Sequence, residues 1–106
     1  MRFLVITKPS HPLPMEAAIG MLEGMSRWVE KNVASGKFEQ IWAFAGTQGG
    51  GGVLNVESHE ELDDVMSEFP FAPFSQVEIL ALTDLQRSLD KGKQVAAAMM
   101  AAMAAH

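Results

Sequence analysis

The sequence has no cysteine, little positive charge and no long apolar run. Without cysteine, a disulfide, a thiol nucleophile and a cysteine-based zinc site are all excluded. Lys and Arg number 8 against 13 Asp and Glu, which gives a net charge of −5, and no basic run is present. Nucleic acid binding is therefore disfavoured, because phosphate contacts need clustered positive charge.

Membrane-spanning and secretory patterns are also missing. No stretch approaches the roughly 18 to 20 consecutive apolar residues that a membrane span needs. The first residues, MRFLVITKPSHP, lack the apolar core and the small-residue cleavage site of a signal peptide. We therefore expect a cytoplasmic protein with no membrane partner.

The chain is nevertheless rich in apolar residues for its length. Its 106 residues are 48% hydrophobic, a composition that disfavours disorder and suits one small core. The sequence shows no internal linker and no repeat. Residues 1–106 are expected to form a single domain.

The most informative stretch is Ile41–Val56, in which two apolar segments flank a glycine run. Glycine carries no Cβ that would forbid a positive φ, so Gly49 to Gly52 predict a hairpin turn or bulge. We place one strand before it at Lys37–Ala45 and another after it at Val53–Glu57. Alternation along the first of these strands puts Phe38, Gln40, Trp42 and Phe44 on the same face.

The remaining segments give a regular order of elements. Ser58 and Glu61 form an S-x-x-E capping box at the start of a helix, and Asp84 is placed to cap the last one. The predicted elements outside the hairpin are a strand at Arg2–Lys8, a helix from about Pro14 to Ala34, a helix from Ser58 to about Phe69, a strand at Gln76–Thr83 and a helix over 85–105. This βαββαβ order with an extra C-terminal helix predicts a ferredoxin-like α+β fold.

The strands carry apolar residues on both faces, as the first strand shows with Phe3 and Val5 alternating with Leu4 and Ile6. Two helices cover only one face of a four-stranded sheet. We therefore expect a second copy of the chain on the other face, in a homodimer or higher homo-oligomer. The C-terminal helix is expected to be an interface element, because its apolar residues alternate at steps of four and three.

Residues Ile41–Leu82 resemble the muconolactone isomerase family. The matching features are the strand that runs into Ala45-Gly46, the strand VLNVES, the helix EELDDVMSEFP and the aromatic segment PFAPFSQVEI. The resemblance implies a dimeric α+β barrel and a cofactor-free shift of a double bond in a small lactone acid. It transfers no catalytic residue, because this chain reads Thr47-Gln48 and four glycines where the isomerase has a histidine and aromatic residues.

Three polar side chains are candidates for proton transfer. His11 lies in a proline-rich loop at a sheet end, Gln48 lies in the hairpin, and Glu78 lies in an apolar strand where burial would raise its pKa. The competing interpretations are a solvated loop histidine, ordinary turn chemistry and an edge or ion-paired carboxylate. His59 and His106 are expected at the surface. No metal-binding spacing such as H-E-x-x-H occurs, so we expect neither a metal nor another cofactor.

A second group of residues is expected to bind a flat apolar substrate. This group comprises Trp42, Phe44, Thr47, Phe71 and Phe74. The aromatic members would equally suit a core or a dimer interface, and Thr47 would suit a plain turn.

The sequence favours a small cofactor-independent enzyme, an isomerase or cyclase acting on a small organic acid, a lactone or a polyketide-like ring. The alternatives are a cofactorless monooxygenase of the antibiotic-biosynthesis type and a non-catalytic oligomeric ligand-binding module. Both alternatives would use the same fold.

Overall fold

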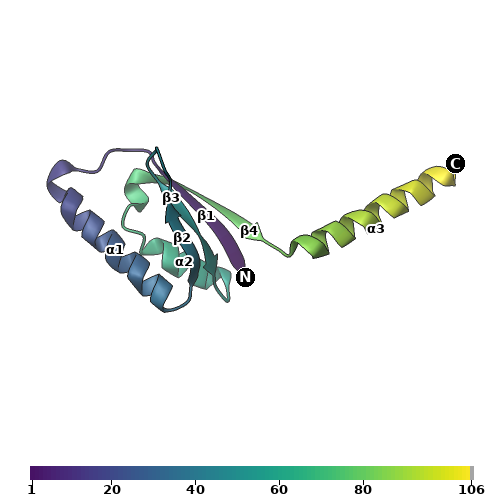
Figure 1. The fold of residues 1–106 in the computed structure, drawn as a ribbon, viewed down its shortest axis with the longest axis horizontal. Coiled ribbons are helices and arrows are strands. Elements are labelled where there is room, and N and C mark those ends of the chain that lie inside the picture. Colours follow the sequence, from purple (N-terminus) through teal and green to yellow (C-terminus); the bar gives the residue numbers. More distant parts are fainter. Residues whose placement is uncertain (106) are drawn as a thin grey trace.

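The structure, a computed structural model, describes residues 1–105 and contains one sheet with helices packed on one side (Figure 1). The strands and α-helices are β1 (Arg2–Pro9), α1 (Ala18–Ala34), β2 (Phe38–Ala43), β3 (Gly50–Asn55), α2 (His59–Ser67), β4 (Ser75–Leu82) and α3 (Leu85–Ala104). The strands are antiparallel in the order β2-β3-β1-β4. The predicted α+β class and ferredoxin-like order are confirmed, and His106 lies outside the described residues.

Local sequence rules explain where the helices begin. Ser58 Oγ accepts a hydrogen bond from the Glu61 amide at 3.1 Å, which confirms the predicted cap of α2. Asp84 Oδ2 accepts one from the Arg87 amide at 2.8 Å at the start of α3. None of the helices within residues 1–105 is long and apolar enough to cross a membrane.

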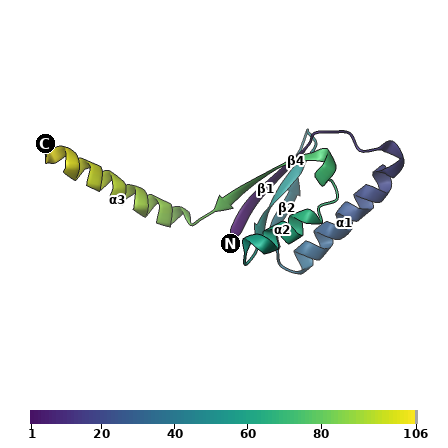
Figure 2. The same cartoon turned by 180° about the vertical axis from the view of Figure 1, so that it is seen from behind.

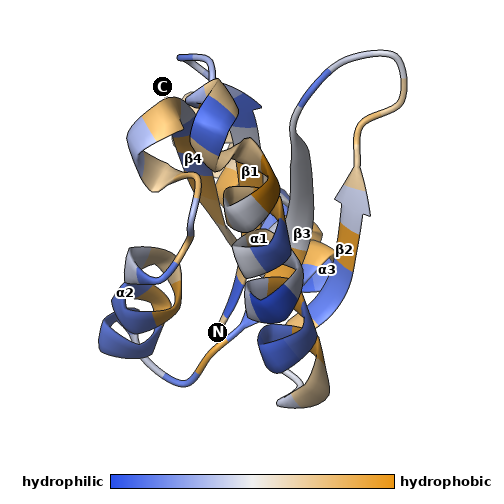
Figure 3. Ribbon diagram, turned by 90° about the vertical axis from the view of Figure 1, so that its left-hand side faces the viewer, coloured by the Kyte–Doolittle hydropathy of each residue, from blue (hydrophilic) through white to orange (hydrophobic). Residues whose placement is uncertain are grey.

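The core lies between the sheet and the helices α1 and α2, and Figure 3 shows α1 in front of the strands with α2 beside it. Trp28 of α1 is its organising residue: its ring meets Phe38 at 5.3 Å and Phe69 at 5.2 Å between centroids. Its indole Nε1 donates a hydrogen bond to the Val65 carbonyl oxygen at 3.0 Å, which ties α1 to α2. Buried aromatic rings in such pairs stabilise beyond the area that they bury.

The hairpin differs from the sequence prediction in two ways. Gly50 to Gly52 belong to strand β3, so the turn is confined to residues 44–49. In β2 the register shifts between Phe38 and Gln40, which leaves Glu39 as an extra residue. Such a bulge reverses the alternation beyond it. Phe38 therefore faces the helices while Gln40 and Trp42 face the opposite side, and the prediction that they share a face is wrong.

The face of the sheet that the helices leave open is apolar, as the sequence predicted. Trp42, Leu80 and Leu82 are each more than 40% exposed there. Helix α3 leaves the end of β4 and extends away from the rest of the chain in both views (Figures 1 and 2), and every described residue of it is exposed. The described chain consequently measures 70 × 28 × 24 Å.

Candidate functional site

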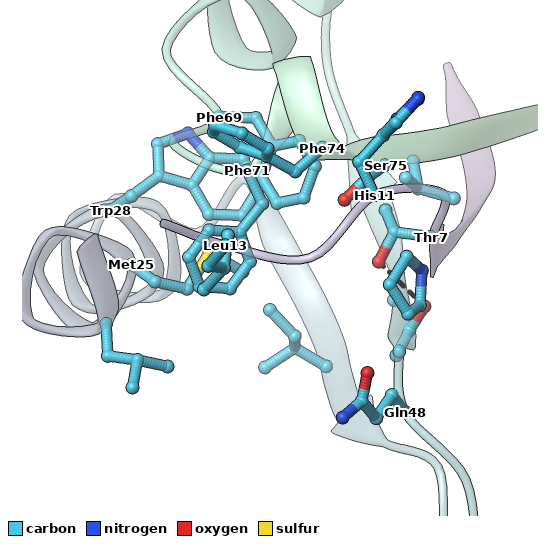
Figure 4. A pocket seen from close by; sticks show the side chains of 18 of the residues that line it. Thr7, His11, Leu13, Met25, Trp28, Gln48, Phe69, Phe71, Phe74 and Ser75 are labelled. Carbon is cyan, nitrogen blue, oxygen red and sulfur yellow. Dashed lines mark hydrogen bonds between the residues drawn. The ribbon is translucent and has the colours of Figure 1, made fainter. Parts of the chain in front are cut away.

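A cavity of about 600 Å³ lies between the helix-covered face of the sheet, helix α1 and the aromatic segment that follows α2. This volume lies within the usual range of small-molecule sites. Figure 4 shows its labelled side chains. The lining residues are Val5, Thr7, Pro9, His11, Pro12, Leu13, Leu22, Met25, Trp28, Phe38, Ile41, Gln48, Gly49, Gly50, Gly51, Gly52, Phe69, Phe71, Phe74 and Ser75.

The floor of the cavity is bare main chain, because residues 50–52 of β3 are glycines. Val5 of β1 pairs with Gly52, and Thr7 pairs with Gly50. Directly opposed residues share a face, so these two glycines face the helices, as the buried Val5 does. An ordinary strand would fill this volume with a side chain at every second position. Gly50 and Gly52 therefore leave open the space that forms the cavity.

Aromatic and aliphatic side chains form one side of the cavity. Phe71 packs its ring edge-on against Phe69, with centroids 6.1 Å apart, and Phe69 in turn contacts Trp28. Met25 lies beside Trp28 on α1, on the same side of Figure 4. The indole N–H of Trp28 is already used by the Val65 carbonyl oxygen, so this side presents an apolar surface to a ligand.

The polar side chains gather at the opposite side, where Figure 4 shows Thr7, His11 and Gln48. Thr7 Oγ1 donates a hydrogen bond to the Gly50 carbonyl oxygen at 3.3 Å. The Nδ1 atom of His11 lies 2.9 Å from the Ser10 hydroxyl oxygen. This contact orients the imidazole ring, and the other ring nitrogen, Nε2, takes no part in it. The arrangement suits a flat molecule with an apolar ring at one end and an oxygen at the other.

The loop that carries His11 is fixed to the neighbouring chain segment. The amides of Ser10 and His11 both donate to the Phe74 carbonyl oxygen, at 2.8 and 3.2 Å. Because Phe74 belongs to the aromatic segment, these bonds hold the loop that carries His11 against the aromatic side of the cavity. The prolines on either side further restrict this loop.

The structure brings four of the sequence-predicted site residues together. His11, Gln48, Phe71 and Phe74 all line the cavity. Their roles in binding or catalysis remain predictions.

The other four predicted site residues do not line the cavity. Glu78 pairs with Ile6, on the sheet face opposite the helices, and it is exposed. Trp42 faces the same open side because of the bulge in β2. Phe44 is half-buried and Thr47 is exposed in the hairpin turn.

Several cavity residues were not singled out from the sequence. Thr7 continues the alternation of Phe3 and Val5, so its hydroxyl side chain falls on the core face at the end of β1, which was a readable signal. Met25 and Trp28 lie three positions apart on α1, but helical spacing alone does not separate a cavity wall from a packed core. Ser10, which contacts His11, does not itself line the cavity.

Comparisons with known proteins match this chain to isomerases. A family model described as muconolactone delta-isomerase matches residues 1–88. Muconolactone delta-isomerase of Rhodococcus opacus is 35% identical over 49 residues, 46% of this chain and 53% of that protein. The Acinetobacter baylyi protein of the same name is 34% identical over 47 residues, 44% of this chain and 49% of that protein. The chain thus spans about half the length of the curated relatives that it matches.

Two solved structures share the fold. A crystal structure of muconolactone isomerase superposes with a TM-score of 0.73 at 23% identity, covering 79% of this chain and 90% of that one. The 5-chloro-2-hydroxyhydroquinone dehydrochlorinase of Burkholderia phenoliruptrix, in complex with 2,5-dihydroxybenzoquinone, superposes with a TM-score of 0.59 at 19% identity. That match covers 82% of this chain and 98% of the dehydrochlorinase. At these identities the two structures show the fold alone.

Proposed function

Because this chain belongs to the muconolactone delta-isomerase family, we propose that it is a small cofactor-independent isomerase whose substrate is a compact organic ring such as a lactone. The observation that supports this most directly is the cavity of about 600 Å³, which has an apolar side and a polar side. The names of its relatives, isomerases and a dehydrochlorinase, do not favour the monooxygenase or the non-catalytic module.

The proposed reaction moves a proton between two carbon atoms of the ring. His11 is the proposed proton carrier: Nε2 takes a proton from a carbon beside the unsaturated carbonyl system and returns it to another carbon. The double bond shifts between these two events, and the product is an isomer of the substrate. Nothing is consumed in this reaction, so it needs no cofactor.

Gln48 is the proposed donor to the carbonyl oxygen. Negative charge develops on that oxygen when the ring carbon loses its proton, and a fixed amide N–H directed at it stabilises the transition state. Both Gln48 and His11 lie on the polar side of the cavity. A substrate ring placed against Trp28 would direct its oxygen towards this pair.

The proposal is tested by proton exchange. A panel of unsaturated five- and six-membered lactones is incubated with the protein in D2O, and NMR follows deuterium incorporation and double-bond migration. We expect His11→Ala to lower the exchange rate by about 10²- to 10⁴-fold, the usual contribution of a general base. His59→Ala is the matched control, because His59 lies on α2 and does not line the cavity. Equal loss in both variants, or exchange unaffected by His11→Ala, would contradict the assignment.

We further propose that the protein works in the cytoplasm as a homodimer or higher homo-oligomer. The apolar open face, with Trp42, Leu80 and Leu82 exposed, supports a second copy as its cover. Helix α3 supports the same assembly, because Leu89 and Met99 are 50% and 62% exposed in the single chain.

A further inference from the structure

The walls of the cavity carry almost no ionisable side chains. Among the described residues that line it, His11 is the one ionisable side chain, and none is Lys, Arg, Asp or Glu. Lys8 is the nearest cation along β1. It follows Thr7, so it projects from the opposite face of the sheet, where it is exposed.

The main chain of the loop that carries His11 also has little to offer an anion. The amides of Ser10 and His11 are both directed to the Phe74 carbonyl oxygen. Pro9 and Pro12, which line the cavity beside them, have no N–H group. The Trp28 indole N–H is likewise occupied by Val65. His11 and Gln48 are exposed, but a carboxylate placed at the apolar side, against the buried Trp28 and Phe69, would lose water and gain few donors in return.

Burying a charge without a partner is far more costly than burying a neutral polar group that finds a hydrogen bond. A lactone, ketone or hydroxyl oxygen needs only one or two donors, and the side chains of Gln48, His11 and Ser75 supply groups of this kind. The lining therefore discriminates by charge as well as by shape.

We propose that this cavity selects uncharged ring compounds bearing carbonyl or hydroxyl oxygens, such as lactones or cyclic ketones, over the corresponding carboxylates. The inference rests on the proposed function, because it takes the cavity to be the substrate site. It narrows the substrate class within that function and excludes a lactone acid in its ionised form as the preferred ligand.

The test compares two probes that differ in one charge, muconolactone and its methyl ester. Isothermal titration calorimetry with the full-length protein at pH 8 measures the Kd of each probe. We expect the ester to bind at least tenfold more tightly than the carboxylate. A carboxylate that binds as tightly as the ester, or more tightly, overturns the proposal, as does failure of both probes to bind at millimolar concentration.

A charge-introducing variant provides an independent readout. Gln48→Lys places a cation at the polar side, and we expect it to raise the affinity for muconolactone at least tenfold while leaving the ester no better bound. Ser67→Lys is the matched control, because Ser67 is exposed on α2 and does not line the cavity. It changes the net charge by the same amount as Gln48→Lys, and we expect it to leave both Kd values unchanged. Equal gains in the two variants would overturn the proposal.

The two proposals can fail separately. If muconolactone binds more tightly than its ester and is isomerised, the charge preference is wrong and the isomerase function stands. If the ester binds more tightly and neither probe exchanges protons, the charge preference stands and the isomerase function loses its support.

Discussion

The ring of Phe38 lies directly against the main chain of Gly52: a Cβ atom on Gly52 would come within 3.1 Å of the Phe38 Cδ1 atom and 2.6 Å of the Gln40 carbonyl oxygen. Both distances are shorter than ordinary van der Waals contact. The absence of a side chain at Gly52 therefore admits Phe38 into the core and leaves the cavity floor open beside it.

Gly52→Ala is expected to destabilise the protein by about 1–3 kcal/mol, the usual effect of overpacking. Chemical denaturation measures the loss of free energy of unfolding. Gly20→Ala is the control, because no atom lies within 4 Å of the position where its Cβ would be. Gly20 is on α1, and we expect its replacement to add up to about 1 kcal/mol of stability. Equal behaviour of the two variants would contradict the packing described here.

Trp28→Phe is expected to lower the free energy of unfolding by about 1–2 kcal/mol. The smaller ring keeps most contacts with Phe38 and Phe69 but loses the hydrogen bond from Nε1 to the Val65 carbonyl oxygen. Urea unfolding provides the measurement. Met15→Ala, at a position that is 90% exposed, should change the value by less than about 0.5 kcal/mol. A Trp28→Phe variant as stable as the wild type would show that this bond does not join α1 to α2 in solution.

Deleting residues 95–106 is expected to lower the order of the oligomer or its melting temperature. The deletion removes the distal part of α3, including Met99, Met100 and Met103, which are 62%, 70% and 75% exposed. Each kcal/mol lost corresponds to about 4–8 °C in a domain of this size. Light scattering gives the mass and calorimetry the melting temperature. If both stay unchanged, α3 is not an interface element.

The ion pair of Lys31 and Glu68 predicts a small pH-dependent effect. Lys31 Nζ donates to Glu68 Oε2 at 2.9 Å, and this hydrogen bond and charge lower the pKa of the Glu68 carboxyl below its usual value. A carboxyl group whose pKa is lowered on folding stabilises the folded state above about pH 5. This contribution is lost as the pH falls through the folded-state pKa. Glu68→Gln should therefore be slightly less stable than the wild type at pH 7 and equal to it near pH 2. A difference that persists at low pH would have another cause.

The order of the elements was predictable because it depends on local rules. The Ser58–Glu61 cap, the cap at Asp84 and the alternation of Phe3 and Val5 are all readable within a few residues, and the structure confirms each of them. The position of His11 at a sheet end also followed from local order, since a loop after a strand lies at the sheet edge. These rules place His11 at a sheet end, whereas the cavity there depends on the pairing of β1 with the glycines of β3.

The faces of the strands were less predictable, because they depend on pairing partners. The bulge at Glu39 exists only in relation to Leu54 and Val53 of β3, and it moves Trp42 to the open face. Glu78 was misplaced as a cavity candidate for a related reason: both alternating sets of β4 contain apolar residues, with Val77 and Ile79 in one set and Leu80 and Leu82 in the other, so the sequence does not tell which set faces the helices.

A crystal structure of the protein with the methyl ester of muconolactone bound tests the proposed site most directly. We expect the ring to lie between Trp28 and the main chain of residues 50–52, with an oxygen within hydrogen-bond distance of Gln48 or His11. An ester bound elsewhere, for example on the open sheet face or along α3, with this cavity empty would contradict it.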